Sequence, residues 1–319
     1  MTESRVSRVN VEGFEALVLE NQFVRATIIP ALGGRVWELQ DRVRRRQWIW
    51  HREGVALKVS APGATYDEVW AGGWEELFPN DAPGNFEGRD LPDHGEWWAL
   101  AWAIEHTAEG ETAVVRLRTS PRVLNTSCVK EFRLPAGTPS LSVTYSIRSA
   151  EVAPFPFLFK QHLPIELTPA CRLRLPGGSV HVVDPSFGTL MPESGPLDWP
   201  VDCAGRGVVD LSEVPPPSAA HREFVYVSDL PEAWCGVDDP QAGASLRMDF
   251  DRRVFPFVWL FLSYGGWRNT YTAVLEPCTN MPKDLAEAVR LGQSAILQPG
   301  GEFVATVTVS LAGLEGEPG

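Results

Sequence analysis

Two stretches of the chain alternate between hydrophobic and polar positions. In the first, Leu141, Val143, Tyr145 and Ile147 are separated by serine and threonine. In the second, hydrophobic residues occupy every other position from Phe303 to Leu311, opposed mainly by threonine and serine. A period of two residues is typical of a β-strand with one buried and one polar face. We therefore predict half-buried strands in the middle of the chain and near its C-terminal end.

The remaining hydrophobic residues occur in short runs between turn-forming residues. Runs rich in β-branched and aromatic residues lie within residues 14–51, 113–118, 127–134, 155–167 and 223–278, as is typical of strands. One short helix is predicted from Lys283 to Leu291, after Thr279 and Asn280 and before Gly292. No repeat of fixed period is present, which argues against a propeller or a solenoid. The pattern predicts an all-β fold of large stacked antiparallel sheets with little helix.

A glycine- and proline-rich region, residues 176–217, is a candidate linker between two domains. Strand-like runs of the same type continue after it, which favours an irregular excursion from one sheet. With 319 residues, the chain is long enough for two ordinary domains, but large β-sandwiches often form a single unit. We predict one domain over residues 1–319, with residues 1–8 and 314–319 as flexible termini.

The stretch from Gly72 to Trp102 combines many turn-forming residues with four tryptophans, several carboxylates and one histidine. Its turn formers predict mostly loop. Long loops within compact domains are usually functional or disordered, and this one is too aromatic for disorder. We therefore expect it to contribute to a functional site.

Charge and cysteine content exclude some classes of function. A formal net charge of −13 argues against general nucleic-acid binding. No apolar run is long enough for a membrane-spanning helix, and the N-terminal MTESRVSRVN lacks the apolar core of a signal peptide, so we expect a cytoplasmic protein without membrane contact. The widely spaced cysteines predict reduced, mostly buried thiols and no cysteine metal motif: Cys128, Cys171, Cys203, Cys235 and Cys278.

Three residues are candidates for proton-transfer chemistry: His94 in PDHGEWW, His162 in FKQHLPIE and Glu276 in YTAVLEPCTNMP. A sugar-processing site needs a carboxylate that accepts a hydroxyl proton and an acid that protonates an ether-like oxygen. It also needs flat aromatic surfaces, which the twelve tryptophans supply. The structural alternatives remain open, because His162 also fits a core histidine, Glu276 also fits a helix-capping carboxylate, and the tryptophans also fit a core.

The order of GGW..LFPN, DHGE.W.L.W, a strand histidine and a late LEP motif resembles the galactose mutarotase-like superfamily, which includes aldose 1-epimerases. The resemblance spans the chain from Gly33 and Gly34 to the last strand, and the FPN and LEPCTN versions resemble a divergent branch. It implies a β-supersandwich with an open cleft on its concave sheet and a reaction without metal or cofactor. It further implies that His162 is the general acid, that Glu276 is the general base and that His94 binds near the ring oxygen.

In this mechanism Glu276 takes the proton of the anomeric hydroxyl while His162 protonates the ring oxygen, which opens the ring. We therefore expect a negative neighbour to raise the pKa of His162, with Asp93, Glu96, Glu75 and Glu76 as candidates, and a polar, partly solvated setting for Glu276. The chain departs from the superfamily in lacking a matching arginine before His94 and a matching aspartate before Glu276. The candidate substrate-binding residues are Trp74, Glu75, Arg35, Glu96, Trp97 and Lys160, although Arg35 also fits an exposed strand arginine.

The leading hypothesis is an isomerase of the aldose 1-epimerase type, monomeric or homodimeric, acting on a small carbohydrate. One alternative is a hexose-phosphate mutarotase, with possible phosphate-binding cations at Arg35, Lys160, Arg252, Arg253 and Arg268. Another is a carbohydrate-binding or sensing protein that lacks the chemistry. A zinc site formed by His94, His162 and Glu276 is the weakest alternative, because their separation in sequence is wide.

Overall fold

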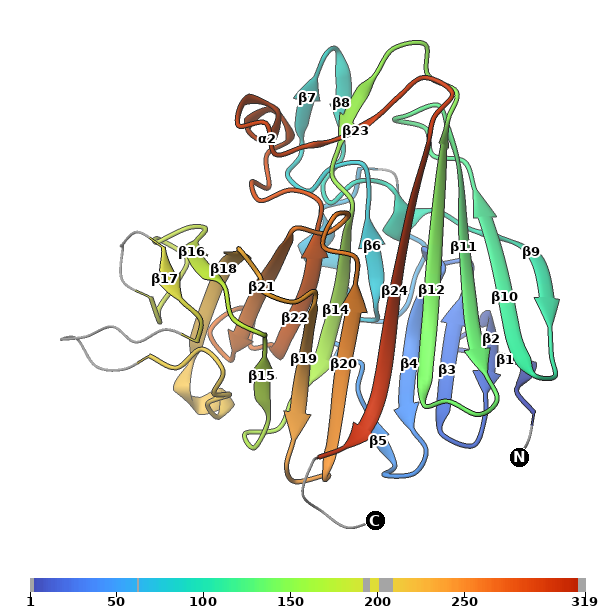
Figure 1. Ribbon diagram of the computed structural model, residues 1–319, viewed down its shortest axis with the longest axis vertical. Coiled ribbons are helices and arrows are strands. Elements are labelled where there is room, and N and C mark those ends of the chain that lie inside the picture. The colour runs from blue at the N-terminus through green and yellow to red at the C-terminus, as the bar shows by residue number, and fades with distance from the viewer. Residues whose placement is uncertain (1–2, 62, 192–195, 201–208, 315–319) are drawn as a thin grey trace.

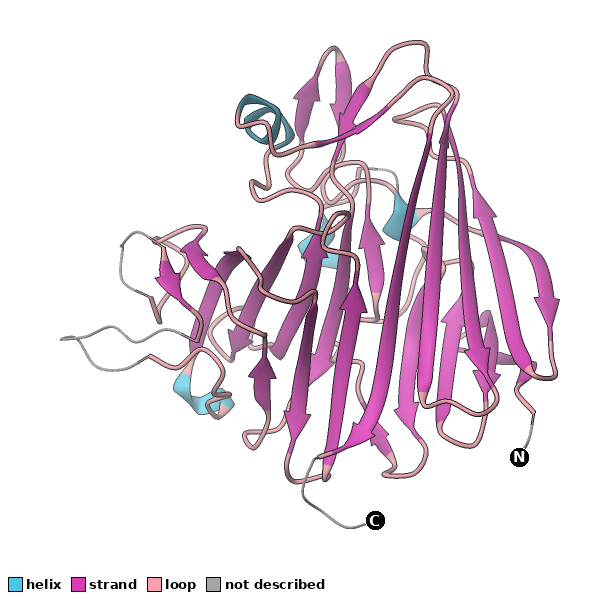
Figure 2. Cartoon of the chain, in the orientation of Figure 1, coloured by secondary structure: helices cyan, strands magenta, loops and turns pink. Residues whose placement is uncertain are grey.

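The computed structural model describes residues 3–61, 63–191, 196–200 and 209–314. Two large antiparallel sheets lie face to face, one in front of the other in Figure 1. Helix is confined to a few short segments (Figure 2). The predicted all-β fold of stacked antiparallel sheets is confirmed.

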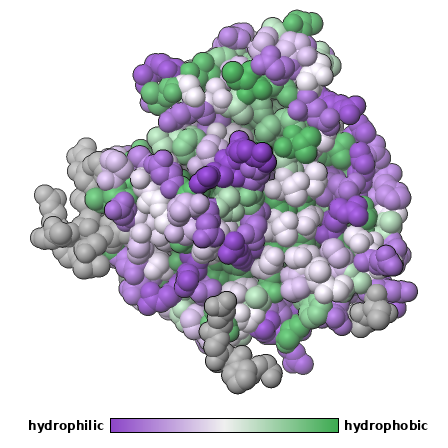
Figure 3. Space-filling view, viewed as in Figure 1, coloured by the Kyte–Doolittle hydropathy of each residue, from purple (hydrophilic) through white to green (hydrophobic). Residues whose placement is uncertain are grey.

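The front sheet has eight strands and contains both alternating stretches. Its strands, in spatial order, are β15 (Arg172–Arg174), β19 (Trp234–Asp239), β20 (Ala244–Phe250), β24 (Glu302–Gly313), β12 (Ser140–Ser149), β11 (Thr126–Pro135), β10 (Thr112–Thr119) and β9 (Ala103–Ala108). The two predicted half-buried strands are β12 and β24, and they pair with each other. Their outward hydroxyls form a cross-strand ladder, with Thr144 and Thr306 at 3.0 Å. The face drawn in Figure 3 is accordingly a mosaic of hydrophilic and hydrophobic residues.

The second large sheet has seven strands. Their spatial order is β17 (Leu197–Asp198), β16 (Ser179–Val182), β18 (His221–Ser228), β21 (Phe257–Tyr264), β22 (Tyr271–Cys278), β14 (Lys160–Glu166) and β6 (Glu75–Leu77). One face packs against the eight-stranded sheet, where Leu163 and Leu275 share a hydrophobic cluster with Val143 and Val307. Strands from before and after residues 176–217 are neighbours in this sheet, as β14 and β22 show.

The N-terminal residues form a five-stranded sheet. It consists of β1 (Arg5–Val11), β2 (Phe14–Glu20), β3 (Val24–Ile29), β4 (Arg35–Asp41) and β5 (Arg46–Gln47). A bridge between Val36 and Trp74 joins it to the segment that leads into β6. The expected flexible terminus at residues 1–8 is wrong for residues 5–8, because these pair with β2. At the other end, residues 315–319 lie outside the described residues.

The shorter elements lie in the connections. They are two small strand pairs, β7 (Gly84–Phe86) with β8 (Arg89–Leu91) and β13 (Phe155–Phe157) with β23 (Ala295–Leu297), and the helical segments α1 (Tyr66–Val69), η1 (Trp97–Ala99), η2 (Pro217–Ala219) and α2 (Leu285–Arg290). The predicted helix is α2, and Asp284 caps it by accepting a hydrogen bond from the Glu287 amide at 2.8 Å. None of the helices in the described ranges has the length and apolar character needed to cross a bilayer.

Two further predictions concern single features of the chain. The stretch from Gly72 to Trp102 is mainly loop, but it contributes β6 to the seven-stranded sheet and carries the short hairpin of β7 and β8. Four of the cysteines are free and buried, as expected: Cys128, Cys171, Cys235 and Cys278. The fifth, Cys203, lies outside the described residues.

Candidate functional site

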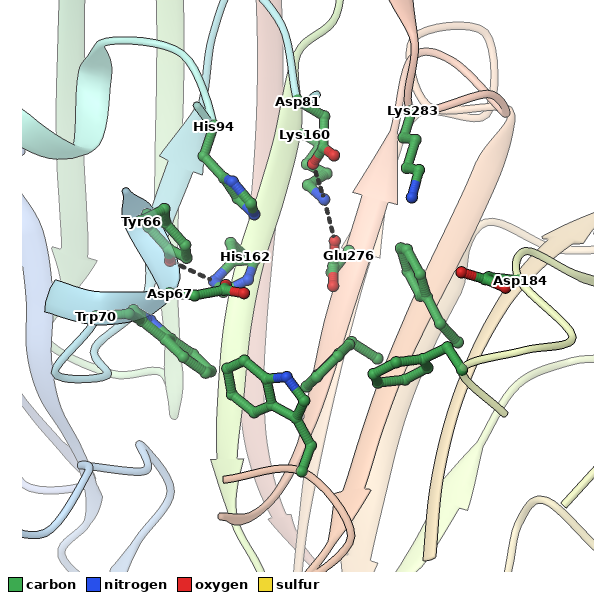
Figure 4. A pocket seen from close by; sticks show the side chains of 14 residues that line it. Tyr66, Asp67, Trp70, Asp81, His94, Lys160, His162, Asp184, Glu276 and Lys283 are labelled. Carbon is green, nitrogen blue, oxygen red and sulfur yellow. Dashed lines mark hydrogen bonds and ion pairs between the residues drawn. The ribbon is translucent and has the colours of Figure 1, made fainter. Parts of the chain in front are cut away.

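A cavity of about 280 Å³ lies on the face of the seven-stranded sheet that is turned away from the sandwich core. His94, His162 and Glu276 all line it, together with Lys160 (Figure 4). The full lining is Tyr66, Asp67, Trp70, Asp81, His94, Lys160, His162, Asp184, Phe187, Phe224, Phe261, Trp267, Glu276 and Lys283. Residues that are far apart in the sequence therefore meet in one small cavity.

Strand alternation determines which side chains of β14 reach the cavity. Lys160 and His162 point to the cavity, whereas Gln161 between them points to the sandwich core. There the Gln161 side-chain oxygen accepts hydrogen bonds from Trp74 Nε1 at 2.9 Å and Tyr145 Oη at 3.0 Å. On the neighbouring strand, Glu276 faces the cavity for the same reason. The period of two thus brings the two predicted proton-transfer residues of the sheet to the same face.

His94 reaches the cavity from a tight turn in the loop. Its own backbone is left-handed, with φ of 60°, and its amide donates to the Asp81 carbonyl oxygen at 2.8 Å. The next residue, Gly95, also has positive φ, and a Cβ there would lie 2.2 Å from the Phe78 carbonyl oxygen. A glycine is therefore required after His94, because any side chain would push this turn away from Phe78.

Lys160 is held between two carboxylates at the centre of the cavity. Its Nζ lies 2.6 Å from Asp81 Oδ2 and 2.5 Å from Glu276 Oε2, and 4.1 Å from the ring centroid of Trp259. Burial acts against the ammonium, but Asp81 and Glu276 outweigh it and raise the pKa of Lys160. Lys160 is therefore a permanent cation at working pH, and it neutralises much of the charge of both carboxylates.

Glu276 does not have the partly solvated setting that we expected. Its side chain is 2% exposed, and burial raises the pKa of this carboxyl group while Lys160 opposes that rise. The expectation was wrong because the sequence gives no sign that Lys160, on the adjacent strand, takes up one carboxylate oxygen. Lys160 therefore neutralises part of the charge of Glu276, although burial leaves the pKa of this carboxyl group above its ordinary value.

His94 is the histidine whose surroundings favour the protonated form. Its Nδ1 lies 2.7 Å from Asp93 Oδ1, and its ring stacks on Tyr66 at a centroid distance of 4.1 Å. Burial lowers the pKa of His94, but the carboxylates of Asp81 and Asp93 outweigh burial and raise it above its ordinary value. A cationic imidazolium is thus available at the edge of the cavity.

His162 has the opposite character. Burial, with added repulsion from the cations Lys160, His94 and Arg35, holds the pKa of His162 well below its ordinary value. The predicted rise in this pKa is therefore wrong. The carboxylates expected to cause it are engaged elsewhere: Asp93 by His94, Glu75 by Arg35 and Tyr66, Glu76 by Lys130, and Glu96 by the amides of Arg122 and Val123.

Of the six predicted substrate-binding residues, only Lys160 lines the cavity. Trp74 and Trp97 are buried in the core between the sheets, and Glu96 caps the backbone of residues 122 and 123. Arg35 and Glu75 form a buried ion pair of 2.5 Å behind Tyr66. None of these five residues lines the cavity.

Several lining residues were missed by the sequence analysis. The tryptophans at the cavity are Trp70, which Figure 4 labels, and Trp267, and not those of the 72–102 stretch. Asp81, within the FPND segment, provides a carboxylate near the predicted motif. Asp184 and Lys283 lie on the opposite side of the cavity from Trp70. Asp184 comes from a segment without any recognisable motif, and Lys283 is predicted only as the first residue of the helix. Within the described ranges, no group of three or more histidine, cysteine or acidic residues is arranged to hold a metal ion.

The sequence matches no known protein-family model. The structure is similar to that of a galactose mutarotase-like protein from Clostridium acetobutylicum, with a TM-score of 0.69, 12% identity and coverage of 98% of this chain and 100% of the other. It is also similar to a galactose mutarotase related enzyme from Lactobacillus acidophilus (TM-score 0.64, 12% identity, 95% and 99% covered) and to the Slr1438 protein from Synechocystis sp. PCC 6803 (0.67, 16%, 98% and 98%). As the resemblance in sequence predicted, the chain has the fold of the galactose mutarotase-like proteins.

Proposed function

We propose that this chain is an aldose 1-epimerase-like isomerase that interconverts the anomers of a free, neutral monosaccharide. The observation that carries the proposal is the convergence of His94, His162 and the Lys160–Glu276 pair on one cavity. Opening a sugar ring needs one group that accepts the anomeric hydroxyl proton and one that protonates the ring oxygen. The cavity contains both a neutral and a cationic imidazole, so both functions are available within it.

The size and lining of the cavity fit a single sugar ring. Its volume of about 280 Å³ lies just below the range of pockets for drug-sized ligands, ~300–1,000 Å³. Aromatic rings of Trp70, Trp267, Phe224 and Phe261 offer flat surfaces for the C–H face of a pyranose. Carboxylates and Lys160 offer hydrogen-bond partners for its hydroxyls.

The charge of the cavity favours a neutral sugar over a sugar phosphate. Four carboxylates line it (Asp67, Asp81, Asp184 and Glu276), against the cations Lys160, Lys283 and protonated His94. The other cations suggested for phosphate binding do not line it: Arg35 pairs with Glu75, Arg253 with Asp251 and Arg268 with Glu68, and Arg252 donates to the Leu230 carbonyl oxygen. A dianionic phosphate would add repulsion to a site that is already rich in carboxylates.

Exchange between anomers, measured by NMR on a panel of aldoses that includes glucose and glucose 6-phosphate, tests the proposal. We expect acceleration over the uncatalysed rate for at least one neutral aldose, and its loss in a variant carrying His94→Asn and Glu276→Gln. His106→Asn is the matched control, because His106 is exposed on β9 of the other sheet. Calorimetric binding of a sugar without any accelerated exchange would overturn the isomerase and favour the carbohydrate-binding alternative.

A further inference from the structure

The phenol of Tyr66 connects the two histidines of the cavity with a buried ion pair behind them. Its ring stacks on His94, and its hydroxyl oxygen lies 3.2 Å from His162 Nδ1. The same hydroxyl donates to Glu75 Oε1, and the other oxygen of Glu75 pairs with Arg35 Nη2 at 2.5 Å. Tyr66 comes from α1, outside every motif of the sequence.

The direction of these hydrogen bonds follows from which of the groups carries a hydrogen. Burial raises the pKa of Glu75, but Arg35, which does not deprotonate in proteins, lies 2.5 Å away, opposes that rise and favours the carboxylate, which can only accept. Burial and the neighbouring Glu75 raise the pKa of Tyr66 well above its ordinary value, so the phenol keeps its proton. That single proton is donated to Glu75. Toward His162 the phenol oxygen can therefore only accept, and Nδ1 of His162 must carry the hydrogen.

A neutral imidazole with its hydrogen on Nδ1 has its lone pair on Nε2. His162 lines the cavity, and among the described residues no hydrogen bond joins its Nε2 to another protein group. The open nitrogen of this histidine is thus an acceptor. By contrast, one carboxylate oxygen of Glu276 is paired with Lys160, and Nδ1 of His94 is paired with Asp93.

We propose, building on the isomerase function above, that Tyr66 is a positioning residue which holds His162 as the Nδ1–H tautomer. In that tautomer Nε2 of His162 accepts the proton of the anomeric hydroxyl, while the imidazolium of His94 protonates the ring oxygen. This assignment makes His162 the base rather than the acid that the sequence resemblance implies. It leaves the Lys160–Glu276 pair to bind sugar hydroxyls.

The proton transfers balance over one turnover. The O–H bond of the anomeric hydroxyl breaks and its proton moves to Nε2 of His162, while the bond between the anomeric carbon and the ring oxygen breaks and that oxygen takes a proton from His94. The open-chain aldehyde then rotates about the bond between its first two carbons. On closure, His162 returns its proton to the carbonyl oxygen and His94 recovers its proton from the attacking hydroxyl, so both histidines end as they began.

The tautomer can be observed directly, without any sugar, from the ¹⁵N and ¹H correlations of the histidine rings. The chain has six histidines, and the His162→Asn variant identifies the signals of His162 by their loss. At pH 7 we expect a neutral His162 ring with its hydrogen on Nδ1. A hydrogen on Nε2, or an imidazolium, would overturn the proposal.

Tyr66→Phe tests the positioning role itself. We expect the hydrogen of the neutral His162 ring to move partly to Nε2, and kcat to fall at least about tenfold with little change in KM, as part of the 10²–10⁴-fold effect of acid–base catalysis. Tyr264→Phe is the matched control, because Tyr264 is equally buried and its hydroxyl has no hydrogen-bond partner in the described part of the chain. It should change neither spectrum nor rate.

The outcomes separate this inference from the function on which it rests. An Nδ1–H tautomer in a protein that exchanges no sugar would overturn the isomerase and leave the tautomer assignment intact. An active protein with the Nε2–H tautomer, or one whose rate is unchanged by Tyr66→Phe, would overturn the inference alone. If the Tyr66→Phe protein does not fold, the wild-type spectrum still decides the tautomer.

Discussion

The two faces of β6 carry closely similar clusters with different consequences. On the cavity side, Glu75 is paired with the cation Arg35 and bonded by Tyr66, which also contacts His162 of β14. On the core side, Glu76 is paired with the cation Lys130 and bonded by Tyr145 at 2.6 Å, which also contacts Gln161 of β14 at 3.0 Å. Each face thus contains a buried glutamate, a cation, a tyrosine and one residue of the same strand.

The difference lies in the last member of each cluster. Gln161 does not titrate, and its side-chain oxygen accepts hydrogen bonds from Tyr145 and Trp74 in the core between the sheets, so the core cluster is structural. His162 can exchange a proton, and it lines a cavity. Burial and charge alone therefore do not identify the functional cluster, because both clusters have them. What distinguishes the cluster on the cavity side is a titratable side chain that lines a cavity.

The largest effect should come from removing that titratable group. His162→Gln keeps a polar side chain of similar reach but cannot accept and return a proton, so we expect the rate of anomer exchange to fall about 10²–10⁴-fold. The rate is measured by NMR with a saturating neutral aldose. The counterpart on the core side is Gln161→Met, which should leave the rate of the folded protein unchanged. A comparable loss in both variants would contradict the division into a functional and a structural face.

The second effect concerns the stability of the core cluster. Lys130→Met leaves Glu76 buried without its cation, and breaking a buried pair in this way lowers the free energy of unfolding by about 3–5 kcal/mol. Urea denaturation measures the loss. Arg116→Met is the control on β10 of the same sheet, because the ion pairs of Arg116 with Glu105 and Glu131 are partly exposed and contribute about 0–1 kcal/mol. Equal losses in the two variants would show that the Lys130 cluster is not the buried network described above.

A smaller effect is expected when the two tyrosines are compared. Tyr145→Phe removes a hydrogen bond to the Glu76 carboxylate and should lower the free energy of unfolding by about 1.5–3 kcal/mol, without changing the rate of anomer exchange. Tyr66→Phe should lower the rate, because its hydroxyl contacts His162. Denaturation and NMR exchange measured on both variants give the comparison. A rate loss in Tyr145→Phe would mean that the core cluster also acts on the cavity.

The sequence predicts on which face of a sheet a side chain lies better than it predicts which residues surround that side chain. Alternation identified β12 and β24, and it explains why His162 points away from Gln161. It does not state which strands are adjacent, and the ion pair between Lys160 and Glu276 depends on the pairing of β14 with β22. For this reason the ionisation of the cavity residues could not be predicted, although the three predicted proton-transfer residues, His94, His162 and Glu276, line one cavity.

The tryptophans show the same limit of prediction from sequence, namely that the surroundings of a side chain are not known. Trp74 and Trp97 belong to the core, whereas Trp70 and Trp267 line the cavity. Hydropathy does not separate these pairs, because all four residues are tryptophans. Asp184 has no local signal, and the helix signal at Lys283 does not point to a cavity, since only the folding of distant segments around the sheet brings the two residues there.

The smallest effect is a shift in the pH profile of exchange, and it depends on the contrast between the two histidines. Because the pKa of His162 is lowered, it remains a neutral acceptor until the pH falls well below the ordinary range, where protonation ends activity. Because the pKa of His94 is raised, it remains a proton donor until the pH rises above that range. The rate should therefore be bell-shaped in pH, with its acid limb set by His162 and its alkaline limb by His94.

Asp93→Asn removes a carboxylate that raises the pKa of His94, so the alkaline limb should move to lower pH while the acid limb stays in place. A shift of the acid limb instead would assign the acceptor role to a group that faces Asp93, and would reverse the roles of the two histidines.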